Sequence, residues 1–118
     1  MLRRSLTVAM LAAPLFLAAC DQKPQAVAAD PAVIARGEAL FTGTCGAYCH
    51  KTTDTGGDAL FLFDCDWKHG STDEVIFKVI NEGVEGTRMV AFGGAFPEGD
   101  KDTSALIAFL RSASQCKK

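Results

Sequence analysis

The sequence predicts a small all-α domain of three main helices joined by long loops. Three segments carry apolar residues at the spacing of one helix face, and each begins near a residue type that caps helices. No segment alternates apolar and polar residues for long enough to propose a strand. With 11 glycines among 118 residues the core is thin, so we expect a staple, a metal or a cofactor to complete it.

The first helix is expected from Pro31 to about Thr42. Asp30 can cap it, and proline is tolerated at the first helical position. One apolar stripe follows, made of Val33, Gly37, Leu40 and Phe41. Glycine inside a helix costs about 1 kcal/mol relative to alanine. Gly37 therefore either marks a close crossing by another helix or is simply tolerated.

The second helix is expected to open at Ser71, with Glu74 three residues later completing a capping box, and to stop at Gly83. Its apolar face is made of Val75, Ile76, Val79 and Ile80. The third helix is expected to start near Asp102 and to fray toward Ser114. Its buried face is made of Leu106, Ile107 and Leu110, with Phe109 beside them.

The first 19 residues are predicted to be a secretory signal and not part of the fold. Arg3 and Arg4 form a positive region, an apolar run too short to span a bilayer follows, and LAAC at 17–20 supplies a small-residue cleavage site. A cysteine directly after small residues resembles the lipobox of bacterial lipoproteins, in which that cysteine is lipidated. Cys20 is therefore the predicted lipidation site. The alternative is an ordinary secreted protein that has a cysteine there.

The segment 20–30 is small, polar and proline-containing, which predicts a flexible tether. The full chain has 12 basic and 14 acidic residues, and losing Arg3 and Arg4 leaves 10 against 14, a net charge of −4. That charge argues against binding to nucleic acid or to anionic lipid, so acyl chains on Cys20 must supply the membrane contact. Asp21 resembles the signal that retains lipoproteins at the inner membrane of some bacteria. The bacterial periplasm, at that membrane, is the favoured location.

Four of the five cysteines remain once Cys20 is assigned to lipid: Cys45, Cys49, Cys65 and Cys116. Free thiols are not expected to survive in an oxidising compartment. The four could form two disulfides, a Cys/His zinc site, or haem thioethers at Cys45 and Cys49 with a disulfide between Cys65 and Cys116. A variant of the last arrangement joins Cys65 to Cys45 and leaves the haem attached through Cys49 alone.

The stretch CGAYCHKT at 45–52 helps to decide between these uses. A covalent haem motif in an exported protein is normally Cys, two residues, Cys, His, whereas three residues separate the cysteines here. His50 directly follows the second cysteine, where it would be carried under the iron as the proximal ligand. Zinc would require the adjacent Cys49 and His50 to reach one tetrahedral ion, which neighbouring residues rarely do. A haem site explains why Cys49 and His50 are adjacent, and a zinc site does not.

Three stretches, in this order along the chain, resemble the class I c-type cytochromes: RGEALFTGTCGAYCH at 36–50, GTRMVAFGG at 86–94 and TSALIAFLRS at 103–112. They look like that family's first helix and haem-binding loop, its distal methionine loop and its C-terminal helix. The resemblance covers most of the predicted domain at 31–116 and implies a fold wrapped around one covalently attached haem. It also implies that Gly37 and Phe41 pack against the C-terminal helix, with Phe109 as the aromatic partner.

The resemblance implies Met89 as the distal iron ligand. Met1 and Met10 leave with the signal, so Met89 is the only thioether of the mature chain. The chain departs from the family here, because Val90 follows Met89 where the family usually has proline. His69 is the competing distal ligand, although it lies on a polar turn that we expect to face solvent.

A second departure is the extra residue between Cys45 and Cys49, which must bulge out of the turn if both thioethers form. Trp67 and Arg88 are candidates to hydrogen-bond the haem propionates, because an indole N–H and a guanidinium both suit a carboxylate. A half-buried aromatic ring and a solvated charge are the alternative interpretations of these two residues.

With His50 and Met89 on the iron no coordination site stays open, and the chain has no nucleophile–base arrangement of its own. We therefore expect a monomeric one-electron carrier and not an enzyme. One alternative is a disulfide-stapled lipoprotein binding module without haem; another is a peroxidase-like or gas-binding haem protein, which needs Met89 off the iron. The stretch FDCDWKHG at 63–70 resembles small cytochromes that serve periplasmic quinoprotein alcohol dehydrogenases. A terminal oxidase or another respiratory cytochrome is an equal candidate partner.

Overall fold

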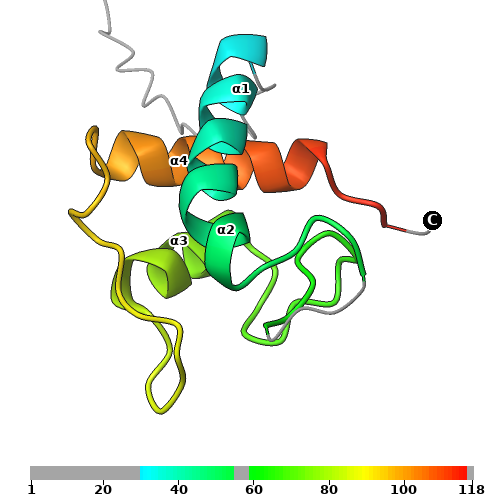
Figure 1. Ribbon diagram of the computed structural model, residues 1–118, viewed down its shortest axis with the longest axis vertical. Helices are drawn as coiled ribbons and strands as arrows, with labels where there is room; N and C mark the ends of the chain where they lie inside the picture. The colour runs from blue at the N-terminus through cyan, green and yellow to red at the C-terminus, as the bar shows by residue number, and fades with distance from the viewer. Residues whose placement is uncertain (1–29, 55–58, 117–118) are drawn as a thin grey trace, which may run out of the picture.

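The computed structural model describes residues 30–54 and 59–116, and within them the helices follow the predicted order (Figure 1). No described residue lies in a strand, so the predicted all-α fold class is confirmed. No helix in this part of the chain combines the length and the apolar character needed to cross a membrane. The predicted signal at 1–19, the lipidation site Cys20 and the tether up to residue 29 lie outside the described residues.

Helix α1, Pro31–Leu40, starts where the sequence predicts, with the Asp30 carboxylate capping its first turn. The expected end near Thr42 is wrong. Helical winding continues through the π-helical segment η1, Phe41–Cys45, and the single turn α2, Gly46–Tyr48. The N–H that follows η1 bonds to a carbonyl five residues back, so the turn widens without breaking.

Helix α3, Asp73–Glu82, begins one residue later than the sequence predicts. Its cap is Thr72, whose hydroxyl oxygen accepts a backbone N–H of the first turn at 3.3 Å. The predicted capping box of Ser71 and Glu74 is therefore wrong. Ser71 stays outside the helix, where its carbonyl accepts a hydrogen bond from Arg111.

Helix α3 ends at Gly83 as predicted, and helix α4, Asp100–Ser112, starts two residues before Asp102. Asp102 is buried in the first turn, and its carboxylate accepts the Glu98 N–H at 2.9 Å. The same carboxylate accepts two hydrogen bonds from the Arg36 guanidinium, each 2.8 Å long. This bidentate ion pair ties α1 to the start of α4.

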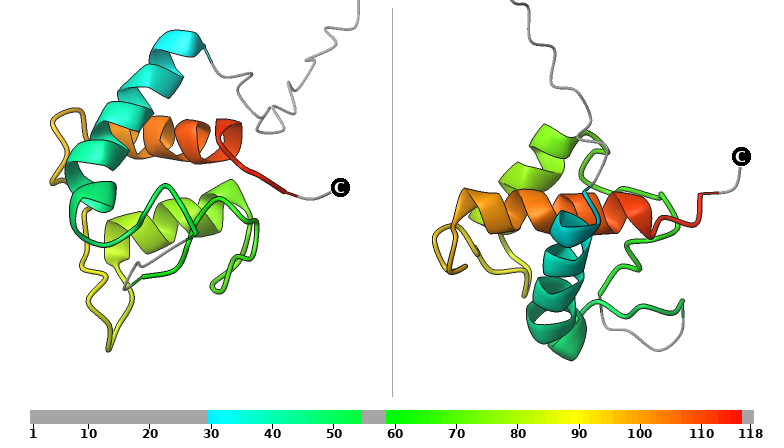
Figure 2. Two further views of the ribbon diagram at one scale, coloured as in Figure 1. Left: turned by 45° about the vertical axis from the view of Figure 1, so that its right-hand side comes forward. Right: turned by 90° about the horizontal axis from the view of Figure 1, so that it is seen from above.

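Helix α1 lies across α4, and the crossing is visible from all three directions in Figures 1 and 2. A Cβ atom on Gly37 would lie 2.0 Å from the carbonyl oxygen of Ala105, which no real contact allows. The close crossing is confirmed, and Gly37 is required at this point of α1. The rings of Phe41 and Phe109 lie 5.5 Å apart between centroids, so the predicted aromatic pairing is confirmed as well.

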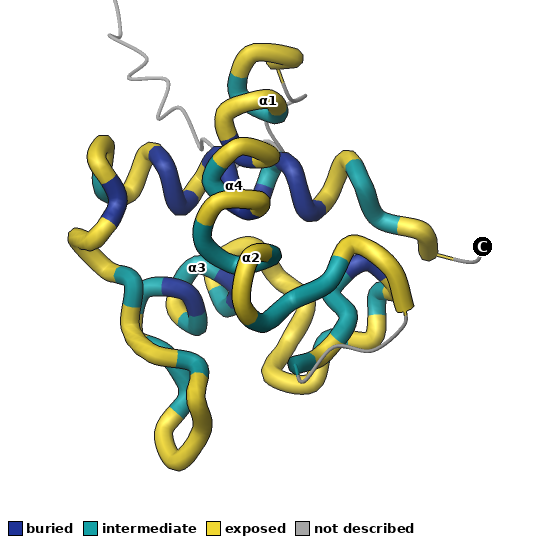
Figure 3. Tube along the Cα trace, viewed as in Figure 1, coloured by how far each residue is buried: buried dark blue, intermediate teal, exposed yellow. Residues whose placement is uncertain are grey.

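The hydrophobic core is concentrated along α4, as the burial colours in Figure 3 show. Phe63, from the loop before α3, completes an aromatic trio with Phe41 at 5.4 Å and Phe109 at 5.9 Å. The remaining large core side chains are Ile76, Ile80, Phe96, Leu106, Ile107 and Leu110. Helix α3 and the loops 59–72 and 83–99 lie on the side of α4 toward which α1 continues into α2 (Figures 1 and 2).

Candidate functional site

A cavity of about 660 Å³ lies among the end of η1, α3, the end of α4 and the loops 59–72 and 83–99, a size typical of ligand and cofactor sites. Most of its wall is apolar, formed by Leu60, Leu62, Ile76, Val79, Ile80, Val84, Phe92 and Leu110. Seven residues that the sequence predicts as thioether sites, iron ligands or propionate contacts also line it: Cys45, Cys49, His50, Trp67, His69, Arg88 and Met89. The fold thus brings residues from three separate stretches of sequence to one apolar chamber.

Cys45 and Cys49 stand four residues apart on continuous helical winding, a spacing that puts both side chains on one face. The N–H groups of Cys49 and His50 both donate to the Cys45 carbonyl, at 3.1 and 2.9 Å. The three intervening residues form the α-helical turn α2, and the bulge expected when both thioethers form stays a prediction, because both cysteines are free thiols here. Tyr48, in that turn, is 80% exposed, whereas both cysteines are half-buried thiols.

The chemical state of Cys45 follows from its burial. Burial, and secondly the neighbouring Cys49, raises the pKa of the Cys45 thiol to about 11. The thiol is therefore uncharged at neutral pH when nothing is bonded to it, and a neutral thiol is a poor nucleophile.

His50 is oriented by the loop that leads back toward α3. Its Nδ1 lies 2.8 Å from the carbonyl oxygen of Leu60. Because a carbonyl only accepts hydrogen bonds, Nδ1 must carry the hydrogen, which leaves the lone pair on Nε2. A backbone carbonyl in this position is a typical outer partner of a metal-binding histidine. Sequence reasoning missed Leu60, and no side-chain pattern could have revealed it, since the contact is made by a main-chain atom.

The Met89 loop is held against the end of α3. The Val84 N–H donates to the Met89 carbonyl at 2.9 Å, and the Met89 N–H donates to the Thr87 hydroxyl at 3.1 Å. Gly83 makes the approach feasible: its φ is +75° and its ψ −169°, and a Cβ there would lie 2.6 Å from the Met89 carbonyl oxygen. Met89 is half-buried at the cavity, while Val90, the departure from the family pattern, is 60% exposed.

The turn before α3 carries Trp67 and His69. The Gly70 N–H bonds to the Trp67 carbonyl at 3.3 Å and closes this turn. Trp67 is half-buried, and the guanidinium carbon of Arg111 lies 5.4 Å from its ring centroid. His69 is exposed, as the sequence predicts, although it also borders the cavity. Arg111 was missed, because its contacts are distant in sequence and carry no local signal.

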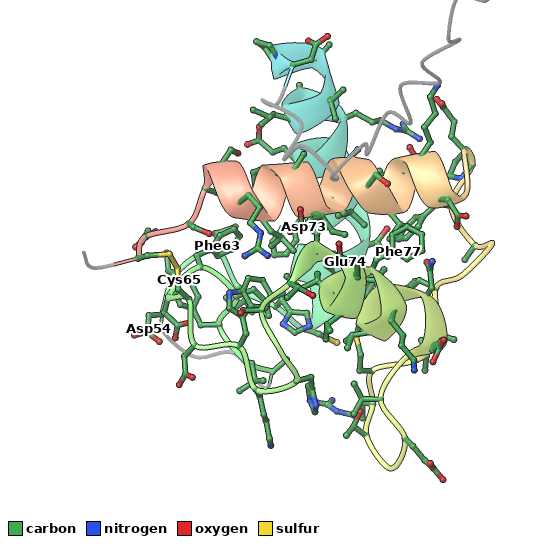
Figure 4. The ribbon with its side chains drawn as sticks, turned by 180° about the vertical axis from the view of Figure 1, so that it is seen from behind. Asp54, Phe63, Cys65, Asp73, Glu74 and Phe77 are labelled. Atoms are coloured by element: carbon green, nitrogen blue, oxygen red, sulfur yellow. A yellow bond between two sulfur atoms is a disulfide. The ribbon has the colours of Figure 1, made fainter. Side chains whose placement is uncertain are left out.

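Cys65 and Cys116 are joined by a disulfide, seen as a yellow bond beside the Cys65 label in Figure 4. Their Cα atoms lie 5.4 Å apart, and the neighbouring Gln115 N–H donates to the Phe63 carbonyl at 2.6 Å. Because Cys65 is bonded here, this arrangement keeps it from joining the haem-motif residues as a zinc ligand or from pairing with Cys45. Within residues 30–54 and 59–116 no three His, Cys, Asp or Glu side chains are grouped to hold a metal ion.

Comparison with known proteins identifies the family of this chain. Residues 32–110 match the family described as cytochrome c oxidase, cbb3-type, subunit III. The chain belongs to this family. The cytochrome is also similar to the cbb3-type cytochrome c oxidase subunit CcoP of Rubrivivax gelatinosus, with 37% identity over 105 residues. That alignment covers 86% of the cytochrome and 34% of the relative, so the chain spans about a third of the relative's length. No solved structure gives a significant match.

Membership confirms the predicted kinship with c-type cytochromes and implies covalently bound haem c and electron transfer. The cavity fits that cofactor on the chemistry of its donors. Two neighbouring thiols suit the two vinyl groups, the His50 imidazole has its lone pair on Nε2, and the Met89 thioether lies on the loop after α3. The apolar wall suits a flat hydrophobic ring.

Proposed function

We propose that this cytochrome is an exported, membrane-anchored one-electron carrier with a single haem c. Cys45 and Cys49 would form the thioethers, and His50 and Met89 would be the axial ligands. The observation that carries the proposal is that these four side chains line one apolar cavity, with the His50 ring already oriented by the Leu60 carbonyl.

Each residue has a distinct task in this proposal. When bound, the haem supplies a one-electron couple at its iron. The Leu60 carbonyl fixes the His50 tautomer so that Nε2 is available to the metal, and Gly83 lets the Met89 backbone approach α3. The apolar wall excludes water. Trp67 and Arg88, also at the cavity, are the proposed contacts of the haem propionates.

The same proposal includes where the protein is anchored and which redox proteins it exchanges electrons with. Lipid on Cys20 would hold the domain at the periplasmic face of the bacterial inner membrane, with segment 20–30 as its tether. The donor or acceptor is a redox protein. The relative's name, a subunit of a cbb3-type cytochrome c oxidase, supports the terminal-oxidase option over the quinoprotein alcohol dehydrogenase. Electrons would pass between a periplasmic dehydrogenase or respiratory complex and this acceptor.

The test of haem attachment is peroxidase staining of the protein after denaturing electrophoresis. Protein matured in a periplasm that can attach haem should stain, and Cys49→Ser should stain weakly or not at all. The matched control is the double variant Cys65→Ser/Cys116→Ser, which removes the disulfide outside the haem motif, leaves no free thiol to pair with Cys45 or Cys49, and should still stain. Absence of stain from the unaltered protein would contradict the proposal and favour a binding module without haem.

The test of axial ligation is the visible spectrum. Oxidised protein should show the weak far-red charge-transfer band of a sulfur–iron bond, and Met89→Ala should lose this band while the haem stays attached. His69→Ala should keep the band. If His69→Ala changes the spectrum and Met89→Ala does not, the distal ligand is His69.

A further inference from the structure

Arg111 makes an unusual set of contacts for a residue at the end of a surface helix. Its guanidinium carbon lies 5.4 Å from the Trp67 ring centroid. Its Nε donates to the Asp73 carboxylate at 2.8 Å, and Nη2 donates to the Ser71 carbonyl. Figure 4 shows Asp73 at the start of α3, directly beside α4. One side chain of α4 thus binds three successive parts of the segment that runs from the cavity wall into α3.

These contacts restrict the guanidinium and, through it, the indole ring. The planar fork of arginine makes both hydrogen bonds in one orientation, which a lysine ammonium cannot reproduce while also stacking on a ring. Trp67 is half-buried and packs against the edge of the hydrophobic core, while its sequence neighbours Asp66 and Lys68 are exposed. The Arg111 guanidinium adds a restraint to this core packing. The stack by Arg111 therefore restrains the position of the indole ring in the cavity wall, in addition to its packing against the core.

We propose that Arg111 is a positioning residue for electron transfer, acting through Trp67. It holds the indole in the wall of the haem cavity, which keeps water away from the haem and raises the reduction potential. The inference rests on the proposed function, since it requires haem in the cavity. The polarity and solvent access of a haem site are among the factors by which a protein sets the potential.

The first experiment is a double-mutant cycle read by the reduction potential of the haem-containing protein. Arg111→Ala should lower the potential in the unaltered background. The same substitution should have little effect in a Trp67→Leu background, because the ring through which it acts is gone. Equal shifts in both backgrounds would overturn the proposal, since Arg111 would then act through its charge or through folding alone.

The second experiment uses the fact that Trp67 is the only tryptophan in the chain, so tryptophan emission reports this ring alone. Acrylamide should quench the emission more efficiently in Arg111→Ala, because loss of the cation–π contact leaves the indole ring more accessible to the quencher. Arg111→Lys keeps the positive charge and disturbs folding less, and it should also increase the acrylamide quenching of Trp67 emission. Asp73→Asn is the control that removes the carboxylate charge but keeps an acceptor oxygen for Arg111 Nε, so the guanidinium should stay in place and the quenching should stay close to that of the unaltered protein.

The outcomes separate this inference from the function on which it rests. If the unaltered protein does not stain for haem, the proposed function fails. If it carries haem but neither Arg111 variant changes the quenching or the potential, the positioning role fails and the haem assignment stands.

Discussion

Replacing Gly37 by alanine should destabilise the domain by about 2 kcal/mol. The added methyl would lie 2.0 Å from the Ala105 carbonyl oxygen and 2.6 Å from its carbonyl carbon, so α1 and α4 must move apart. Overpacking a filled site costs about 1–3 kcal/mol, and a backbone partner, which cannot rotate away, puts the cost at the upper end. Alanine regains about 1 kcal/mol of helix propensity. For a domain of this size the difference lowers the melting temperature by about 8–16 °C.

The matched control is Gly43→Ala, the same substitution in the helical segment that continues α1. No heavy atom lies within 4 Å of the Cβ that would be added there. This variant should gain about 0.5–1 kcal/mol from the reduced freedom of the unfolded chain. Thermal and urea unfolding, followed by far-ultraviolet circular dichroism, measures both. If Gly37→Ala is no less stable than Gly43→Ala, the helix crossing does not depend on close backbone contact and the reasoning fails.

Three other predictions concern the site and its supports. Gly83→Ala should displace the Met89 carbonyl, since a Cβ would lie 2.6 Å from it at a φ of +75°; the far-red sulfur–iron band should weaken while haem staining persists, and an unchanged band would refute the role of this glycine. The hydrogen bond from Arg36 lowers the pKa of Asp102 in the folded protein. The ionised Asp102 carboxylate therefore stabilises the fold fully above the ordinary carboxyl pKa of about 4, and this stabilisation is lost as the pH falls through the lowered pKa of the folded state. Asp102→Asn should remove this part of the acid dependence of the urea midpoint, and an unaltered acid dependence would contradict it. In haem-free protein the Cys45 thiol should resist iodoacetamide at neutral pH and react faster as the pH approaches its pKa of about 11, which peptide mass spectrometry can follow; rapid labelling at pH 7 would show that the thiol is not buried.

The sequence predicted those parts of the fold that depend on local pattern or on the family resemblance. The start of α1 at Asp30, its stripe and the stop of α3 at Gly83 each depend on a few adjacent residues. The helix pattern left Gly37 open between a close crossing and a tolerated glycine, and the family resemblance favoured the crossing. The pairing of that face with Phe109 came from the resemblance alone.

The features that were missed depend on contacts between distant segments. Ser71 is the better sequence candidate for the α3 cap, but in the structure its carbonyl accepts a hydrogen bond from Arg111 outside the helix. Thr72 is the cap instead. The ion pair between Arg36 and Asp102 joins residues 66 positions apart, and neither has a local pattern that indicates the other. The same holds for the Leu60 carbonyl at His50. Such contacts follow from how the helices cross, which periodicity does not specify.

If the chain is exported as proposed, the disulfide between Cys65 and Cys116 has a consequence for the order in which its thiols are oxidised. It closes a covalent ring that contains α3 and α4 and leaves Cys45 and Cys49 outside. Four thiols can pair as two disulfides in three ways, and closing this ring eliminates two of them. The motif cysteines precede the ring in sequence, so a translocating chain presents them to an oxidant first. Under the proposed function, the relative speed of haem attachment and thiol oxidation at Cys45 and Cys49 would therefore decide how much of the chain matures.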